Sequence, residues 1–261
     1  MNEDDRITSL PNSILCYILS FLPTKQVVTT SVLSKHWKPL WRSVSSLEFD
    51  SKDFNFDEIY FHRSIYSFLF LRDSDQPLNR LRIKCFPFKI YQDPPIDVQT
   101  LFETATRGSC RLEHLHINLD QTYHMPSVVF SCKTLVVLKL AYTTVKNISF
   151  VDLPFVNLPL LKILHLYRVI FLNNQDCLRL FSKIPNIEEL EVTTDYLVGL
   201  KVTTDYLAMK PTDVMTGKFN RLPKLIRAKI HGDLVPLKIV KDVEVLVVDE
   251  VRLICYSFPF F

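Results

Sequence analysis

The stretch V-N-L-P-L-L-K-I-L-H-L, residues 156–166, decides the fold of this chain. Within it, Leu161, Leu164 and Leu166 follow the spacing L-x-x-L-x-L. A Leu-Pro pair stands just before them, and a short apolar run after such a turn signal predicts a buried strand. One copy of the spacing would carry little weight because leucine is common, so its recurrence along the chain is what matters.

The spacing recurs from about residue 44 to residue 248, with Ile, Val, Phe or Ala at some positions. Its four middle units follow one another at intervals of 23–26 residues, whereas the outer units are less regular. The eight units are Val44/Leu47/Phe49, Leu78/Leu81/Ile83, Leu112/Leu115/Ile117, Leu135/Leu138/Leu140, Leu161/Leu164/Leu166, Ile187/Leu190/Val192, Leu225/Ala228/Ile230 and Val243/Leu246/Val248. This pattern is typical of leucine-rich repeats, in which each coil supplies one short parallel strand. An ordinary α/β domain whose buried strands share the spacing is the alternative.

A different pattern occupies the first 46 residues, where apolar positions follow helical spacing. Ile14, Leu15, Ile18, Leu19 and Leu22 lie at i, i+1, i+4, i+5 and i+8, which predicts one apolar helix face. Pro11 suits the first turn of this helix, and Pro23 ends it. Thr24 is expected to cap a second short helix and Ser34 a third, which carries Trp37, Leu40 and Trp41. Because three short helices bury little surface by themselves, this unit needs a neighbour.

The segment S-V-L-S-K-H-W-K-P-L-W, residues 31–41, together with Leu10-Pro11 and the apolar positions that follow, resembles the F-box of plant F-box proteins. Asn12-Ser13 and His36 depart from the usual residues, but they lie off the apolar face. The resemblance implies docking on a Skp-family adaptor, which links the protein to a cullin–RING ligase. The implied adaptor contacts are Leu10, Pro11, Ile14, Leu15, Ile18, Leu22, Val32, Leu33 and Trp37.

An F-box followed by leucine-rich repeats is similar to the plant F-box/leucine-rich-repeat proteins, of which many carry a further FBD domain. We therefore expect an α/β fold, with a small three-helix F-box at residues 1–46 and a leucine-rich-repeat solenoid with a parallel sheet at residues 47–250. The apolar residues 251–261 are expected to form a C-terminal tail, without a complete FBD domain.

Target binding is expected on the repeats, along the residues that lie between the last two apolar positions of each unit. These residues face away from the core, on the concave side that solenoids use for binding. The candidate residues of this row are Arg82, His116, Lys139, His165, Glu191 and Lys229. Their charges are mixed, which argues against a polyanion such as nucleic acid.

Other function classes have little support in the sequence. Only four glycines occur, and none forms a phosphate-binding loop. We find no local motif of a catalytic nucleophile or a zinc enzyme, and His114, His116 and His165 have no carboxylate or cysteine at a matching interval, so we expect no catalytic residue, no metal and no cofactor. Neither a secretory signal nor an apolar run long enough for a membrane span is evident, and the six scattered cysteines suggest free thiols, so we expect no membrane association and an intracellular protein of the nucleus or cytoplasm.

Three functions remain open at this stage. The first is the substrate-recognition subunit of a Skp–cullin–F-box (SCF) ubiquitin ligase, which binds the adaptor through the F-box and an unknown target protein through the repeats. The second is an adaptor-binding or scaffold protein that does not deliver a substrate. The third is a hydrolase or transferase on an α/β fold, since a catalytic triad assembles in space and leaves no compulsory sequence motif.

Overall fold

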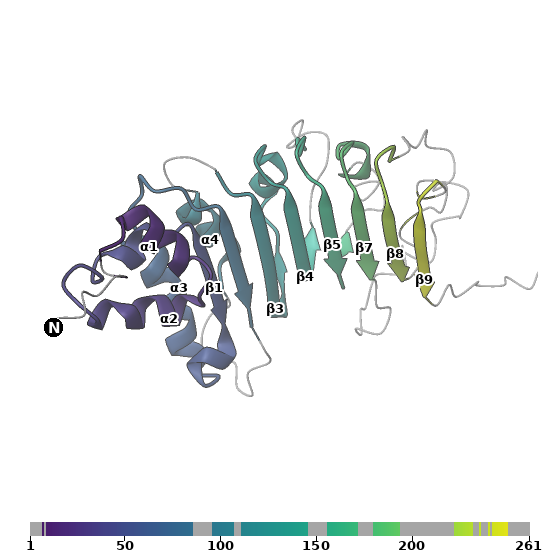
Figure 1. The fold of residues 1–261 in the computed structure, drawn as a ribbon. Coiled ribbons are helices and arrows are strands. Elements are labelled where there is room, and N and C mark those ends of the chain that lie inside the picture. Colours follow the sequence, from purple (N-terminus) through teal and green to yellow (C-terminus); the bar gives the residue numbers. More distant parts are fainter. Residues whose placement is uncertain are drawn as a thin grey trace, which may run out of the picture.

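A computed structural model describes residues 7, 9–85, 96–106, 111–145, 156–171, 180–193, 222–231, 235, 240 and 242–249. The predicted tail at residues 251–261 lies outside these residues. Strands run side by side across the molecule, and helices gather at its N-terminal end (Figure 1). This is the α/β architecture that the sequence predicts.

The described strands form one nine-stranded sheet whose pairs are all parallel. Its order follows the chain from β1 to β9, except that the short β6 pairs only with β4. The strands are β1 (Ser46–Asp50), β2 (Arg80–Lys84), β3 (His114–His124), β4 (Val137–Val145), β5 (Ile163–Tyr167), β6 (Ile170–Phe171), β7 (Glu189–Thr193), β8 (Arg227–His231) and β9 (Val245–Asp249). Eight of them coincide with the eight L-x-x-L-x-L units, so the prediction of leucine-rich-repeat strands is confirmed.

Pairing of the strands places equivalent residues of each unit in line. Leu138, for example, pairs with Leu115 on one side and Leu164 on the other. From β1 to β8, the second and fourth residues of each strand's first five are buried in a common core. Because side chains alternate along a strand, the first, third and fifth residues lie on the opposite side of the sheet, which we call the outer face.

Two α-helices precede the next strand in the first two coils. α3 (Glu58–Leu71) lies between β1 and β2, and α4 (Val98–Ala105) lies between β2 and β3. Phe61, Ile65 and Leu69 of α3 are buried at i, i+4 and i+8, as expected for a helix with one face against the core. Shorter 3₁₀ segments, η3 (Ser51–Phe54) and η4 (Ser127–Ser131), complete the described connections.

The N-terminal helices differ in detail from the sequence prediction. α1 (Asn12–Leu19) ends before Leu22, with Pro11 as its N-cap residue. α2 (Thr24–Thr29) is followed by η1 (Thr30–Val32). In place of a third α-helix, residues 35–39 form turns and η2 (Leu40–Ser43) follows. Pro39 explains this difference, because proline inside an α-helix removes a hydrogen bond and clashes with the preceding turn.

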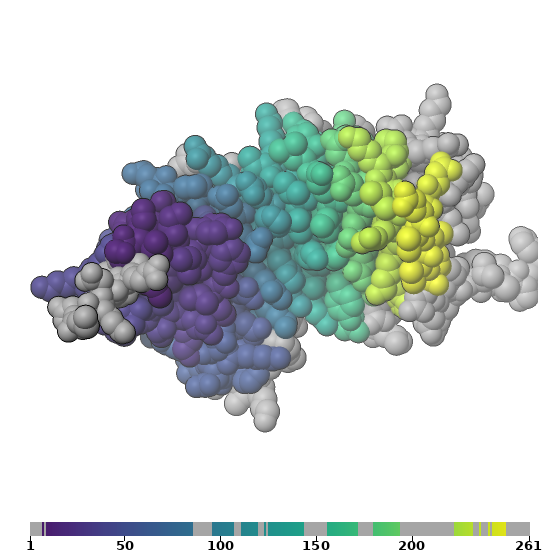
Figure 2. Space-filling view, in the orientation of Figure 1, coloured from purple at the N-terminus to yellow at the C-terminus, as the bar shows by residue number. Residues whose placement is uncertain are grey.

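Thr24 joins the N-terminal helices to the sheet instead of capping α2. Its hydroxyl oxygen accepts a hydrogen bond of 2.7 Å from the backbone N–H of Glu48 in β1, and its side chain is buried. Leu15, Leu19 and Leu40 belong to the same continuous core as the repeat leucines. The N-terminal helices therefore close one end of the solenoid, where Figure 2 shows them in purple.

The cysteines only partly follow the expectation of free thiols. Cys16 and Cys85 form no disulfide. Cys132 is disulfide-bonded, so the expectation is wrong at this position.

Candidate functional site

Exposed apolar side chains gather on the N-terminal segment, within residues 14–33. Phe21 is 69% exposed and Val32 is 84% exposed, which is unusual for side chains of this size in a folded protein. Clusters of this kind mark interaction sites in soluble proteins. We call the group the N-terminal apolar set, and its members are Ile14, Tyr17, Ile18, Phe21, Val32 and Leu33.

Four of the predicted adaptor contacts belong to this set, namely Ile14, Ile18, Val32 and Leu33. Pro11 is exposed at the start of α1, while Leu10 and Leu22 are partly buried against the core.

Leu15 and Trp37 lie elsewhere, in the core of the chain itself. Leu15 is 0% exposed and Trp37 is 7% exposed. The single apolar stripe that the sequence predicts is thus divided between two faces of α1. The side chains of Leu15 and Trp37 cannot reach a partner unless the core opens. We remove both from the proposed adaptor contacts.

Tyr17 and Phe21 are exposed residues that the sequence reasoning missed. Their rings contact each other edge to face, with centroids 4.9 Å apart. Tyr17 lies on α1 and Phe21 in the turn that follows, while Ile14 and Ile18 lie at i and i+4 and are neighbours on the helix surface. Two pairs of apolar residues in the sequence have i, i+4 spacing, Ile14 with Ile18 and Tyr17 with Phe21. This spacing could have indicated the second apolar face.

On the outer face, the predicted target-binding row forms one continuous line. Strand pairing places Arg82 beside His116, His116 beside Lys139, and Lys139 beside His165. The line continues to Glu191 on β7 and Lys229 on β8. The structure therefore places all six residues of the row side by side, as the sequence predicts.

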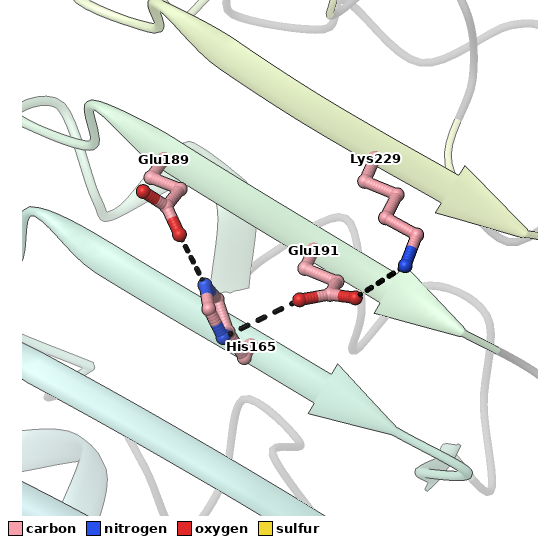
Figure 3. A network of polar contacts seen from close by, with 4 residues as sticks. All are labelled: His165, Glu189, Glu191 and Lys229. Carbon is pink, nitrogen blue, oxygen red and sulfur yellow. Dashed lines mark hydrogen bonds and ion pairs between the residues drawn. The ribbon is translucent and has the colours of Figure 1, made fainter. Parts of the chain in front are cut away.

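Acidic residues at the two ends of this row are paired with cations on adjacent strands. Near β1, Glu48 lies 3.0 Å from Arg82 and Asp50 lies 3.8 Å from Lys84. Near β7, Glu191 lies 3.0 Å from Lys229. Figure 3 shows that His165 points between two carboxylates of β7. Its Nε2 lies 2.6 Å from Glu189 Oε1, and its Nδ1 lies 3.5 Å from Glu191 Oε2.

The middle of the row is electrostatically positive. Burial, together with the smaller effects of Arg82, Lys139, His165 and Lys84, lowers the pKa of His116 to about 4. Burial and Arg80 also lower the pKa of His114. Both imidazoles are therefore neutral at pH 7, beside charged Arg82 and Lys139.

An aromatic and guanidinium cluster joins Tyr142 within β4 to the C-terminal end of β5. The Arg168 Cζ atom is 5.4 Å from the ring centroids of both Tyr142 and Tyr167. Tyr142 and Arg168 have positive φ angles of 58° and 51°. Such angles in residues other than glycine cost about 1–3 kcal/mol and occur often at functional sites. Tyr167 itself is 41% exposed beside Ala141 on the outer face.

Comparison with known proteins agrees with this geometry. Residues 7–49 match the model of the F-box domain, which covers α1, α2 and nearly all of β1. Over 232 residues, the chain is 36% identical to an F-box/FBD/LRR-repeat protein of Arabidopsis thaliana, a match that covers 88% of this chain and 47% of the relative. The chain is an F-box/leucine-rich-repeat protein of the plant type.

A second relative of this F-box/leucine-rich-repeat chain is an FBD-associated F-box protein of Arabidopsis thaliana. The two are 37% identical over 195 residues, which are 73% of this chain and 44% of the relative. The F-box/leucine-rich-repeat chain thus spans less than half the length of these curated relatives. No solved structure matches it.

Two negative findings concern the described part of this F-box/leucine-rich-repeat protein. None of its described helices is long and apolar enough to cross a membrane. No group of three or more His, Cys, Asp or Glu side chains there is arranged to hold a metal ion.

Proposed function

We propose that the chain is the substrate-recognition subunit of an SCF-type ubiquitin ligase. The single observation that carries this proposal is the N-terminal apolar set, which lies exposed within the segment that matches the F-box model. In this proposal, a Skp-family adaptor covers the apolar set and links the chain to a cullin–RING ligase. The chain acts without catalytic residues of its own, in the nucleus or cytoplasm.

The physical basis of adaptor binding is the burial of apolar surface. A helical segment with exposed apolar residues at i, i+3, i+4 and i+7, as in α1 and the turn that follows it, fits a hydrophobic groove of a partner. Ile14, Tyr17, Ile18 and Phe21 have this spacing. Burial of one such side chain contributes about 1.5–3 kcal/mol.

The outer face of the repeats is the proposed binding surface for the target protein. Its row from Arg82 to Lys229 offers charged and polar side chains in fixed register across six strands. Holding a target there raises the local concentration of that target near the ubiquitin-transfer machinery.

Adaptor binding tests the first half of the proposal. Phe21→Ala should weaken the affinity for a purified Skp-family adaptor by about 1–3 kcal/mol, because it removes an exposed aromatic anchor. Lys35→Ala is the matched control, since Lys35 is exposed in the same segment but is not apolar. Isothermal titration calorimetry with the full chain measures both affinities.

The outcomes separate the candidate functions. Equal affinities of the Phe21→Ala and Lys35→Ala variants would contradict adaptor docking through the apolar set. If the adaptor and cullin are retained but no protein accumulates when the chain is removed from cells, the chain is a scaffold and not a receptor. A turnover activity that survives removal of residues 1–45 would instead favour an enzyme.

A further inference from the structure

The centre of the outer face differs from its flanks in the distribution of charge. On both flanks, carboxylates and cations of neighbouring strands neutralise each other, as in the pairs Glu48–Arg82 and Glu191–Lys229. Along the first five residues of β3, which pair with β2, the outer positions hold His114, His116 and Asn118. On β4, they hold Val137, Lys139 and Ala141. These six positions therefore hold one cation and two imidazoles but no carboxylate.

Lys139 is the cation at the middle of this region. No carboxylate forms an ion pair with it among the residues that the structure describes. Its neighbours in the row are His116, whose pKa is lowered partly by Lys139 itself, and His165, whose ring already contacts two carboxylates. Lys139 thus remains available for an anion from outside the chain.

The surroundings of Lys139 suit a carboxylate at the end of a short side chain. Lys139 is half-buried between β3 and β5, where a charge is screened by solvent less than on an open surface. Ala141 is small and leaves Tyr167 accessible on the next strand. Arg168 stacks against the Tyr167 ring and holds it in place. The ring offers an apolar contact for the residues that flank the anion.

We propose that the surface formed by His116, Lys139, His165 and Tyr167 binds an acidic segment of the target protein, with an Asp or Glu carboxylate on Lys139. The inference rests on the proposed function, because it names the kind of segment that a receptor of this type would recognise. Charge complementarity carries it, since Lys139 is the cation of the row that has no carboxylate partner among the described residues, whereas Arg82 and Lys229 on the flanks are already paired with carboxylates.

Fluorescence anisotropy with defined peptides tests the inference. The probe is a fluorescein-labelled peptide of alternating Glu and Ala, and its control is the same peptide with Gln in place of Glu. The full chain, purified together with its adaptor, should bind the Glu peptide at least about tenfold more tightly than the Gln peptide. This preference should weaken as salt is added, because ions screen the contact.

Substitutions of lysine locate the binding site. Lys139→Gln should reduce the affinity for the Glu peptide about tenfold, whereas Lys139→Arg should retain it. Lys133→Gln is the matched control, because Lys133 is an exposed lysine just before the same strand and should leave the affinity unchanged. Thermal unfolding of each variant verifies that the fold is retained.

Three results would overturn the inference: no binding of the Glu peptide, equal binding of both peptides, or an equal loss in the Lys133→Gln and Lys139→Gln variants. Failure of the proposed function gives a different result. In that case the chain does not retain the adaptor during purification, and this outcome is read before any peptide is added.

Discussion

At the scale of single residues, His116 shows how position changes chemistry. The sequence places it in the outer row, but only the structure shows that burial and four neighbouring cationic or imidazole groups lower its pKa to about 4. An unfolded histidine has a pKa of about 6.5. Between these two values, the unfolded chain binds a proton that the folded chain does not, so the free energy of unfolding falls as the pH is lowered.

His116→Gln should reduce the pH dependence of stability. The contribution of neutral His116 to the free energy of unfolding is fully present above about pH 6.5. It is lost as the pH falls toward 4, because the pKa of His116 is lower in the folded chain than in the unfolded chain. In the variant, the midpoint of thermal unfolding should therefore fall less over this range than in the unmodified chain. Circular dichroism at a series of pH values measures the midpoints.

His36→Gln serves as the control for that experiment. His36 is exposed in the F-box, where its Nε2 lies 2.5 Å from Asn12 Oδ1. If the two variants lose the same amount of pH dependence, the burial of His116 is not its cause.

At the scale of elements, α1 has two apolar faces with different tasks. Leu15 and Leu19 face the core, whereas Ile14 and Ile18 face solvent. The sequence predicted a single stripe because all four residues fit within one helical half. A helix packed on one side only would leave its remaining apolar residues exposed to water, and this exposure is what the proposed adaptor removes.

The neighbours Ile18 and Leu19 allow the two tasks to be separated. Leu19→Ala should lower the free energy of unfolding by about 2–5 kcal/mol, because it opens a cavity in the core. Ile18→Ala should change stability little and should weaken adaptor affinity by about 1–2 kcal/mol. Urea denaturation and calorimetric titration measure the two effects, and a large stability loss in Ile18→Ala would contradict this division.

At the scale of the whole molecule, the F-box and the repeats share one core. Core residues run continuously from Leu15 in α1 to the last described repeats, and Thr24 accepts a hydrogen bond from the first strand. The proposed boundary at residue 46 therefore separates two sequence patterns but not two cores. Such coupling implies that the N-terminal helices depend on β1 and α3 for their stability.

Unfolding of the F-box and of the sheet should be a single event. Both tryptophans, Trp37 and Trp41, lie in the F-box, so tryptophan fluorescence reports that segment and the contact of Trp41 with Phe68 of α3. Far-ultraviolet circular dichroism reports the sheet as well. The two signals should give the same midpoint in urea.

Replacement of Thr24 by Val tests the coupling further. The change leaves the buried N–H of Glu48 without its acceptor and should lower the common midpoint without separating the two signals. An independent, earlier fluorescence transition in the unmodified chain would show that the F-box unfolds by itself.

The sequence by itself determined the eight main strands and the outer row of side chains. It could do so because a buried strand repeats its apolar residues at short, fixed intervals, and because strand alternation assigns the residue between them to the other face. The F-box was predictable for the same reason, since its pattern lies within about 40 contiguous residues.

Only the tertiary structure decided which apolar residues remain exposed and which charges are neutralised. Leu15 and Ile14 are adjacent and both apolar, yet packing of α1 against η2 buries Leu15 and leaves Ile14 in solvent. Glu191 and Lys229 lie on different strands, so only strand pairing brings them together. Lys139 has no carboxylate as an ion-pair partner among the described residues because its neighbouring strands are β3 and β5. These properties depend on contacts between residues distant in the chain, which local spacing does not encode.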